Sequence, residues 1–260
     1  INIYEEIGDE KGIADAKYNI AGIYYKTDNP NIGLIFLKEC LETYQQIDDF
    51  HNISKVYKSI GTIFEYFDDQ KSAIHAYEQS IEAGIAAGDP NLESNAYNPL
   101  SGIYLNSGQV KKAMELIQKS IQMKNQTGDR RGLGFALYGR GKVYTSMKMY
   151  GEAEKDLQEA LEIHLTAKDP LGVGMTYNKL ASLYIEMDHL DKAKKIIHEN
   201  LKSTHKGTKI KLLSFKSFYL LYRIAKKEGD HETALKYLEQ HNQEKESVIN
   251  SRTLKVIESY

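Results

Sequence analysis

Large and small apolar residues recur along this chain with a period of 40 residues. Two sets of large residues follow it: Tyr24, Phe64, Tyr104, Tyr144 and Tyr184, and Leu37, Tyr77, Ile117, Leu157 and Ile197. Two sets of small residues do the same: Ala21, Gly61, Ser101, Gly141 and Ala181, and Gly33, Ala73, Ala113, Ala153 and Ala193. The apolar positions between them have helical spacing. A period kept so strictly predicts a stacked solenoid of one repeated unit, rather than a single enzyme core.

Polar positions mark where the helices begin and end. An aspartate recurs at each repeat boundary, and proline follows it twice: Asp9, Asp49, Asp89, Asp129 and Asp169, with Pro90 and Pro170. Aspartate caps free amides and proline suits the first helical position, so each boundary predicts a helix start. A second polar or glycine-containing break follows about twenty residues later. Each unit is therefore predicted to be an antiparallel hairpin of helices of about 17 and 18 residues.

The small residues predict where paired helices cross closely, because they let two backbones approach while larger residues fill the grooves beside them. The recurrent aromatic residues are predicted to be core. Cys40 stands where other repeats have serine or alanine, so we expect it to be buried. Pro99 lies inside a first helix and is predicted to bend it and expose a carbonyl near Asn95, either as a groove-shaping kink or as a tolerated irregularity.

These positions together resemble the tetratricopeptide repeat. The resemblance is carried by Tyr57, Ser59, Ile60, Gly61, Phe64, Ala73 and Tyr77, by Tyr97, Leu100, Tyr104 and Ala113, and by Tyr177, Leu180, Tyr184 and Ala193. It covers essentially the whole chain, with departures at Arg140 and Ala225. Repeats longer than the usual ~34 residues are similar to the sensor or regulatory regions of bacterial signalling proteins. The resemblance implies an all-α, right-handed superhelical solenoid of antiparallel helix hairpins.

The predicted solenoid is a single domain over residues 1–247. A partial repeat at 1–8 precedes six repeats at about 9–48, 49–88, 89–128, 129–168, 169–208 and 209–247, with one residue inserted after Lys206–Lys209. Residues 248–260 are predicted to form a helical cap or lead-out. Ile1 is in phase with Leu41 and Ile81, so we expect the chain to open inside a second helix whose partner lies upstream. Exposed ends of this kind would permit weak homo-oligomers.

The resemblance implies a ligand-binding groove lined by the first helix of each repeat. Ten residues carry this prediction: Tyr18, Tyr25, Lys58, Asn95, Asn98, Tyr138, Lys142, Asn178, Tyr219 and Arg223. The same register adds Gly22, Thr62, Met175, Ser182 and Lys216, among others. Asparagine can pair with a peptide backbone and tyrosine offers an apolar face with a polar tip, so the predicted ligand is a protein or peptide segment. Asn98 and Asn178 are expected to meet only water in the free protein.

The carboxylate clamp of some family members, a Lys-Asn-Asn-Lys-Arg set, is not reproduced. Gly139, Lys179 and Leu220 stand where its later arginine would fall. Charge is also uneven along the chain: residues 1–130 hold 12 lysines and arginines against 19 acids, and residues 131–260 hold 22 against 17. The basic excess gathers between Lys192 and Lys227. It permits an anionic partner, RNA or an acidic protein, although nucleic acid is disfavoured because no recognised motif accompanies the charge.

Motifs of catalysis and metal binding are missing from the sequence. It has no His-Glu-x-x-His, no glycine-rich phosphate loop, no Gly-x-Ser-x-Gly and no paired cysteines, so we predict no enzyme activity, no metal site and no cofactor. No apolar run approaches the ~18 residues of a membrane span, so no membrane segment is predicted. A single cysteine favours a cytoplasmic location, with the periplasm left open.

Two functional hypotheses follow. In the first, the chain is a non-enzymatic peptide-binding scaffold or sensor within a larger bacterial signalling protein. In the second, it is an intramolecular regulatory arm that controls a fused effector domain, a kinase or nucleotide cyclase, outside this chain. The segment from Glu244 to Tyr260 favours the second, because it resembles the helical lead-out to such effectors, although a solvating cap helix also explains it.

Overall fold

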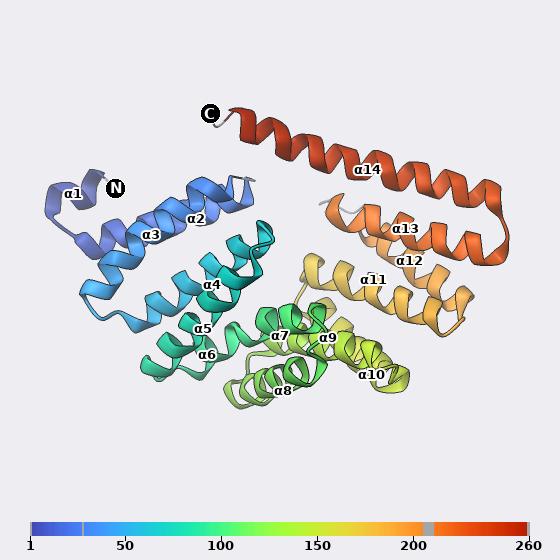
Figure 1. The fold of residues 1–260 in the computed structure, drawn as a ribbon, viewed down its shortest axis with the longest axis horizontal. Coiled ribbons are helices and arrows are strands. Elements are labelled where there is room, and N and C mark those ends of the chain that lie inside the picture. The colour runs from blue at the N-terminus through green and yellow to red at the C-terminus, as the bar shows by residue number, and fades with distance from the viewer. Residues whose placement is uncertain (1, 28, 205–210, 259–260) are drawn as a thin grey trace. The chain divides into compact units, whose positions relative to one another are not determined.

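The computed structural model describes residues 2–27, 29–204 and 211–258, and these are helical with short turns and no strand (Figure 1). The helices are α1 (Asn2–Ile7), α2 (Glu10–Lys26), α3 (Pro30–Gln46), α4 (Phe50–Tyr66), α5 (Gln70–Ala86), α6 (Pro90–Asn95), α7 (Tyr97–Asn106), α8 (Val110–Thr127), α9 (Arg130–Ser146), α10 (Tyr150–Thr166), α11 (Pro170–Glu186), α12 (Leu190–Thr204), α13 (Lys211–Glu228) and α14 (His231–Glu258). The predicted all-α solenoid of helix hairpins is confirmed. The insertion predicted after Lys206–Lys209 and the phase of Ile1 lie outside the described residues.

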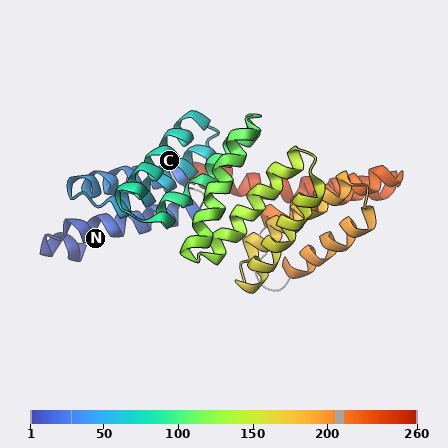
Figure 2. The ribbon, with the colours of Figure 1, turned by 90° about the horizontal axis from the view of Figure 1, so that it is seen from below.

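The chain divides into two compact units, which we describe separately. Unit 1 comprises residues 1–129 together with 255–260, and unit 2 comprises residues 130–254. In unit 1, α2 pairs with α3, α4 with α5, and α7 with α8, and each hairpin packs on the next. In unit 2, α9 pairs with α10 and α11 with α12, while side-chain hydrogen bonds join α13 to α14. Figure 2 shows from a second direction that neighbouring helices within each unit follow one another in chain order.

Aspartate caps start the first helices as the sequence predicts. Asp9 accepts a hydrogen bond from the Gly12 amide at 2.8 Å, and Asp49 accepts one from the Asn52 amide at 3.1 Å. Asp89 and Asp169 cap α6 and α11 in the same way. Each such cap contributes about 1 kcal/mol. The fourth boundary aspartate, Asp129, lies 2.8 Å from the ammonium of Lys124 in α8.

The small residues lie at helix crossings as predicted. A Cβ built on Gly61 would stand 2.6 Å from the Tyr77 ring, and one built on Gly141 would stand 2.7 Å from Leu157. Each unit has its own apolar core around these crossings. In unit 1 the core includes Leu37, Cys40, Tyr44, Val56 and Ile63, and in unit 2 it includes Leu157, Leu180, Leu183, Ile197 and Ile224. Cys40 is fully buried, which confirms its predicted place, and burial raises the pKa of its thiol to about 12.

The third repeat departs from the predicted bent helix. Its first helix is interrupted at Ala96, so that α6 ends at Asn95 and α7 begins at Tyr97. Pro99 then lies in the first turn of α7, where a missing amide costs little, instead of in a helix interior where its ring would clash with the Asn95 carbonyl. The prediction of a bend is therefore corrected to a break.

A buried lysine of α8 binds α6 just before this break. Lys124 in α8 is 2% exposed, and its ammonium donates to Asn95 Oδ1 at 2.6 Å and to Asn91 Oδ1 at 3.1 Å. The same ammonium pairs with Asp129 at 2.8 Å. A buried charge is tolerated when it is paired and hydrogen-bonded, so these partners explain why a lysine can occupy the core here.

Candidate functional site

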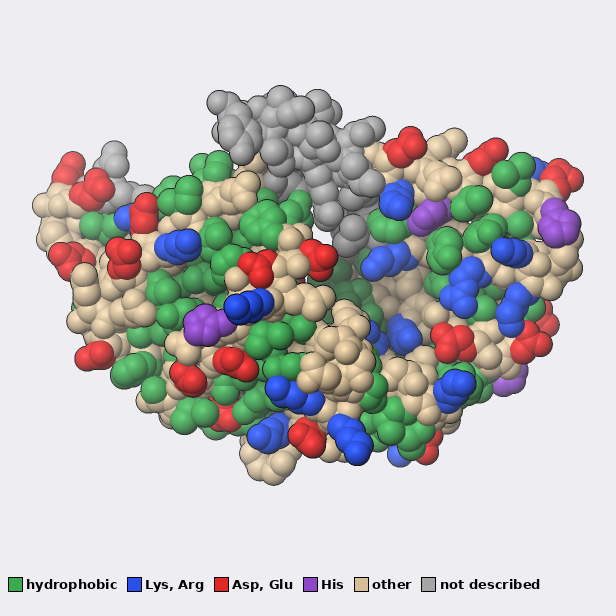
Figure 3. Space-filling view, in the orientation of Figure 1, with side chains coloured by type: hydrophobic (Ala, Val, Ile, Leu, Met, Phe, Trp, Pro, Cys, Tyr) green, Lys and Arg blue, Asp and Glu red, His purple; other side chains and the backbone are tan. Residues whose placement is uncertain are grey.

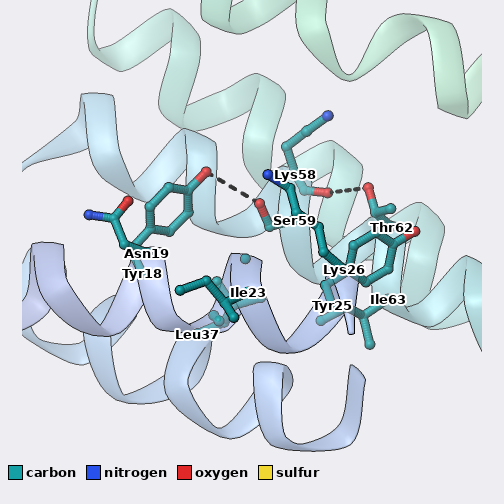
Figure 4. Close-up of a pocket in the computed structure, with 12 residues that line it drawn as sticks. Tyr18, Asn19, Ile23, Tyr25, Lys26, Leu37, Lys58, Ser59, Thr62 and Ile63 are labelled. Atoms are coloured by element: carbon teal, nitrogen blue, oxygen red, sulfur yellow. Dashed lines mark hydrogen bonds between the residues drawn. The ribbon is translucent and has the colours of Figure 1, made fainter. Parts of the chain in front are cut away.

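The first helices of unit 1 line a pocket of about 310 Å³ (Figure 4). Its lining comes mainly from α2 and α4, with Leu37 from α3: Tyr18, Asn19, Ala21, Gly22, Ile23, Tyr25, Lys26, Leu37, Lys58, Ser59, Thr62 and Ile63. Three of the ten predicted groove residues, Tyr18, Tyr25 and Lys58, are therefore brought together here. The pocket combines aromatic faces with ammonium groups, which suits a peptide segment.

Hydrogen bonds within the chain hold several of these side chains in place. The Tyr18 hydroxyl points toward Ser59, with their oxygens 3.4 Å apart (Figure 4). Thr62 Oγ1 donates to the Lys58 carbonyl at 3.0 Å, one turn back along α4. The Lys58 ammonium is solvent-accessible but stands among many protein atoms, and this desolvation lowers its pKa despite the opposing effect of Glu65. An anion brought to Lys58 would favour the charged form of its ammonium group and so oppose this lowering of the pKa.

Unit 2 holds a larger pocket of about 450 Å³ on its first helices. It is lined by residues of α9, α11 and α13, and by His241 of α14: Tyr138, Leu171, Met175, Asn178, Lys179, Ser182, Leu213, Phe215, Lys216, Tyr219, Leu220 and His241. Tyr138, Asn178 and Tyr219 were predicted groove residues. Burial raises the pKa of the Tyr138 hydroxyl to about 12, so it remains a hydrogen-bond donor at neutral pH.

Two predicted cations lie near this pocket without lining it. The Lys142 ammonium stands over the Tyr138 ring, 6.0 Å from its centroid, and Arg223 Nη1 is 3.5 Å from Ser182 Oγ. The pKa of Lys179 is lowered, first by desolvation and then by Lys142 and Arg223, while Glu186 opposes the shift. Lys142 and Arg223 therefore each lie close enough to Lys179 to repel its ammonium group.

Asn178 has partners within the protein. Its side chain is 8% exposed; Nδ2 donates to the Leu213 carbonyl at 3.1 Å, and Oδ1 accepts from Ser217 Oγ at 2.7 Å and from Asn200 Nδ2 at 3.1 Å. The expectation that Asn178 meets only water in the free protein is wrong. The second helix of its own repeat and the next first helix pack over it, so its amide links α11, α12 and α13.

The two asparagines of the third repeat differ from each other. Asn95 is exposed, but its Oδ1 already accepts from Lys124. Asn98 is half-buried, and its Oδ1 has no hydrogen-bond partner among the described residues. Neither residue lines the pockets of α2–α4 or α11–α13. Of the three predicted asparagines, Asn98 is thus the one whose acceptor is unpaired, but that oxygen is buried and not open to a ligand.

The basic stretch from Lys192 to Lys227 does not form one uniform surface. Lys194 pairs with Glu228 at 2.6 Å, and Lys227 pairs with Asp188 at 3.0 Å. Lys216 lines the pocket of unit 2 and Arg223 contacts Ser182. Lys206 and Lys209 lie outside the described residues. Several cations are thus engaged by acids, while others face the pocket.

Six lining residues of unit 2 were not among the predicted groove positions: Leu171, Lys179, Leu213, Phe215, Leu220 and His241. Lys179 follows the predicted Asn178 directly, so a wider reading of the same helix face would have found it. His241 comes from a second helix, which the prediction excluded from the groove. Its Nδ1 lies 2.7 Å from the Phe215 carbonyl, a contact between α14 and α13 that no repeat pattern contains.

Two further features bear on what the site can do. Within the described part of the chain, no group of three or more histidine, cysteine, aspartate or glutamate side chains is arranged to hold a metal ion. Across those same residues, no helix is long and apolar enough to cross a membrane.

Comparison with known proteins identifies the repeats. The sequence model of the family described as Tetratricopeptide repeat matches residues 12–84 and 92–166. No curated protein matches this sequence.

Solved structures resemble the fold at low sequence identity. BtubC from P. vanneervenii is 16% identical, with a TM-score of 0.67 over 83% of this chain and 90% of that chain. A signal transduction ATPase with a tetratricopeptide repeat sensor from Pyrococcus horikoshii is 19% identical, with a TM-score of 0.66 over 95% of this chain but 38% of that one. A Rap protein complexed with Competence and Sporulation Factor is 12% identical, with a TM-score of 0.68 over 90% and 75%.

Proposed function

This chain belongs to the tetratricopeptide repeat family, and from that premise we propose that it is a non-enzymatic scaffold or sensor module that binds a protein or peptide segment. The observation that carries the proposal is the pocket of about 450 Å³ on the first helices of unit 2, where apolar side chains lie beside lysines. An extended segment can place an apolar side chain in such a pocket while its polar groups meet the rim.

A sensor role within a larger signalling protein is the form of this proposal that we favour. Among the similar structures, the Pyrococcus horikoshii ATPase carries its repeats as a sensor, and this chain matches 38% of it. The Rap protein structure holds Competence and Sporulation Factor. Both support a role in which a ligand binds to the repeats and another part of the same protein responds. The lone, buried Cys40 accords with a cytoplasmic location, with the periplasm as the alternative.

An intramolecular regulatory arm is the second candidate, and the length of α14 favours it. This helix spans 28 residues, from His231 to Glu258, which exceeds the 17 or 18 residues of most other helices in the described chain. A long terminal helix can connect a solenoid to a kinase or nucleotide cyclase domain. In that case the pockets would bind a segment of the same protein instead of a separate ligand.

Selection from a random dodecapeptide display library would test the proposed function. We expect selected peptides to bind the purified chain and to lose at least tenfold in affinity, measured by calorimetry, on Tyr25→Ala or Tyr219→Ala. Tyr66→Ala is the matched control, because Tyr66 is similarly exposed but lines neither pocket. If no peptide is enriched, or if all three variants bind alike, the proposal fails.

A further inference from the structure

All the charged residues that line the pocket of unit 2 are positively charged. Lys179 and Lys216 contribute ammonium groups, and no aspartate or glutamate is among the lining residues. Lys142 and Arg223 add charge close by, since both act on Lys179. Figure 3 shows lysine and arginine side chains gathered over the part of unit 2 that contains α11, α12 and α13. The local charge therefore favours an anionic ligand.

Two arginines of unit 2 are neutralised within the chain, unlike Lys179. Arg140 makes a bidentate pair with Asp156 at 2.6 and 2.8 Å, and Arg131 pairs with Asp169 at 2.9 Å. Lys179 is half-buried and forms no ion pair in the part of the chain that the structure describes. Glu186 favours the charged form of Lys179 but makes no ion pair with it. An incoming carboxylate in contact with this desolvated ammonium would therefore gain more than at a surface pair.

Most of the remaining lining is apolar, although Asn178 and Ser182 also contribute to it. Leucine and methionine side chains from α11 and α13 form most of its wall: Leu171, Met175, Leu213 and Leu220. Phe215 and Tyr219 complete it and pack against the His241 ring, with centroids 5.4 and 5.2 Å away. The contact between His241 Nδ1 and the Phe215 carbonyl holds this aromatic side in place. Such a wall accepts an aliphatic or aromatic side chain.

We propose that unit 2 binds an acidic peptide segment, with a carboxylate between Lys179 and Lys216 and a neighbouring apolar side chain in the pocket beside Phe215 and Tyr219. The inference rests on the proposed function and names the class of its ligand. An RNA strand is the less suitable occupant, because a single strand binds along a track of cations that follows its backbone, whereas the two lysines here stand beside one pocket with an aliphatic side of Leu171, Met175, Leu213 and Leu220.

The test is a selection from the random dodecapeptide library on the wild-type chain and on a Lys179→Gln, Lys216→Gln double variant. We expect the peptides that the wild type enriches and the double variant does not to carry aspartate or glutamate beside phenylalanine, leucine or methionine. For the most enriched peptide, replacing its acids by their amides, or using the double variant, should raise Kd at least tenfold. Affinity should also fall with added salt.

A matched control and a charge reversal complete the experiment. Lys195→Gln with Lys202→Gln removes two exposed lysines of α12 outside the pocket and should leave Kd unchanged. Lys179→Glu with Lys216→Glu should instead enrich peptides with lysine or arginine beside the apolar residue. Retention of the circular dichroism spectrum shows that each variant is folded.

Several outcomes would overturn the inference. Enriched peptides without acids, equal binding by the double variant and the wild type, or tighter binding of a uridine dodecamer than of any peptide would each contradict it. If peptides bind the wild type and only Tyr25→Ala abolishes their binding, the proposed function stands and the acidic-peptide inference fails. If no peptide binds, both fail.

Discussion

One position of the repeat carries a different side chain in each of the first four repeats: Tyr44, Gly84, Lys124 and His164 follow one another at 40-residue intervals. Tyr44 donates to Asp15 at 2.6 Å, and Lys124 donates to the side-chain carbonyl oxygens of two asparagines in α6. A Cβ on Gly84 would meet the backbone of α6. His164 is fully buried. The repeat therefore fixes the location of this position but not its chemistry.

His164 should make folding stability depend on pH. Its ring packs on Phe135 and against Gly134 and Gly172 without a close hydrogen bond, and burial lowers its pKa, with Asp169 opposing. A lowered pKa means that the unfolded chain binds the proton more readily. The stabilisation is therefore complete above the unfolded pKa of about 6.5 and is lost as pH falls below it.

The measurement is the thermal unfolding midpoint at about pH 8 and about pH 5. We expect the fall between them to be smaller for His164→Leu than for the wild type, because leucine cannot protonate. His75→Gln, at an exposed position of α5, should keep the fall of the wild type. An unchanged fall in His164→Leu would show that His164 is not the titrating group.

Lys124→Ala should destabilise unit 1 by about 3 kcal/mol, since it leaves Asn91, Asn95 and Asp129 without their shared cation. Urea unfolding followed by circular dichroism measures this loss. Lys119→Ala removes an exposed lysine from the same helix and should change stability by less than about 0.5 kcal/mol. Equal effects of the two changes would contradict the role assigned to Lys124.

At the scale of helices, the turns between them are uniform in geometry although their residues differ. Gly108 and Gly229 hold left-handed backbone between the paired helices of two repeats, with φ of 78° and 76°. Asp68, Lys148 and Asp188 take the same conformation with φ of 58°, 58° and 62°. A residue with a side chain is strained in this region of backbone conformation. The turns at Asp68, Lys148 and Asp188 therefore form against the backbone preference of their own residues.

Lys148→Gly should therefore stabilise the protein by about 0.5 to 1 kcal/mol, the strain relieved exceeding the entropy that glycine loses on folding. Lys155→Gly makes the same change at an exposed position inside α10 and should destabilise by about 1 kcal/mol. Thermal unfolding of both variants measures the contrast. A loss of stability in Lys148→Gly would show that the left-handed turn costs nothing there.

Two glycines within helices should respond oppositely to alanine. Gly61→Ala would drive a methyl into the fully buried Tyr77 ring and should cost about 1 to 3 kcal/mol. Gly102 has open space around its Cβ direction, so Gly102→Ala should gain about 0.5 to 1 kcal/mol from helix propensity. Urea unfolding measures both changes. A gain in stability for Gly61→Ala would contradict the close packing of α4 against α5 at this position.

At the scale of the whole molecule, the chain has two compact units, each with its own core. In repeat proteins stability is largely a sum of local terms. A destabilising substitution in the core of one unit therefore need not destabilise the other unit equally. Leu180→Ala in the core of unit 2 should cost about 2 to 5 kcal/mol locally. Hydrogen exchange should accelerate more in α9–α12 than in α2–α5. Equal acceleration in both would show a single cooperative unit.

The sequence by itself determined the elements whose causes are local or periodic. Asp49 caps α4 because its carboxylate reaches an amide three residues away, and Gly61 meets Tyr77 because the 40-residue pattern repeats their spacing. It also brought Tyr18, Tyr25 and Lys58 to one pocket, since equivalent helix faces line up when identical hairpins stack. The break at Ala96 was only half predicted, as a bend at Pro99.

Only the tertiary structure decided which polar groups pair and which stay available. Asn178 is bound to Leu213, Asn200 and Ser217, whereas Lys179, the next residue along the same helix, lines the pocket and makes no ion pair with the described residues. A repeat pattern places Cα atoms to within a helix turn, but a hydrogen bond depends on distances of about 3 Å between side-chain atoms of different helices. Those distances follow from packing, and packing is set by residues that the repeat leaves free to vary.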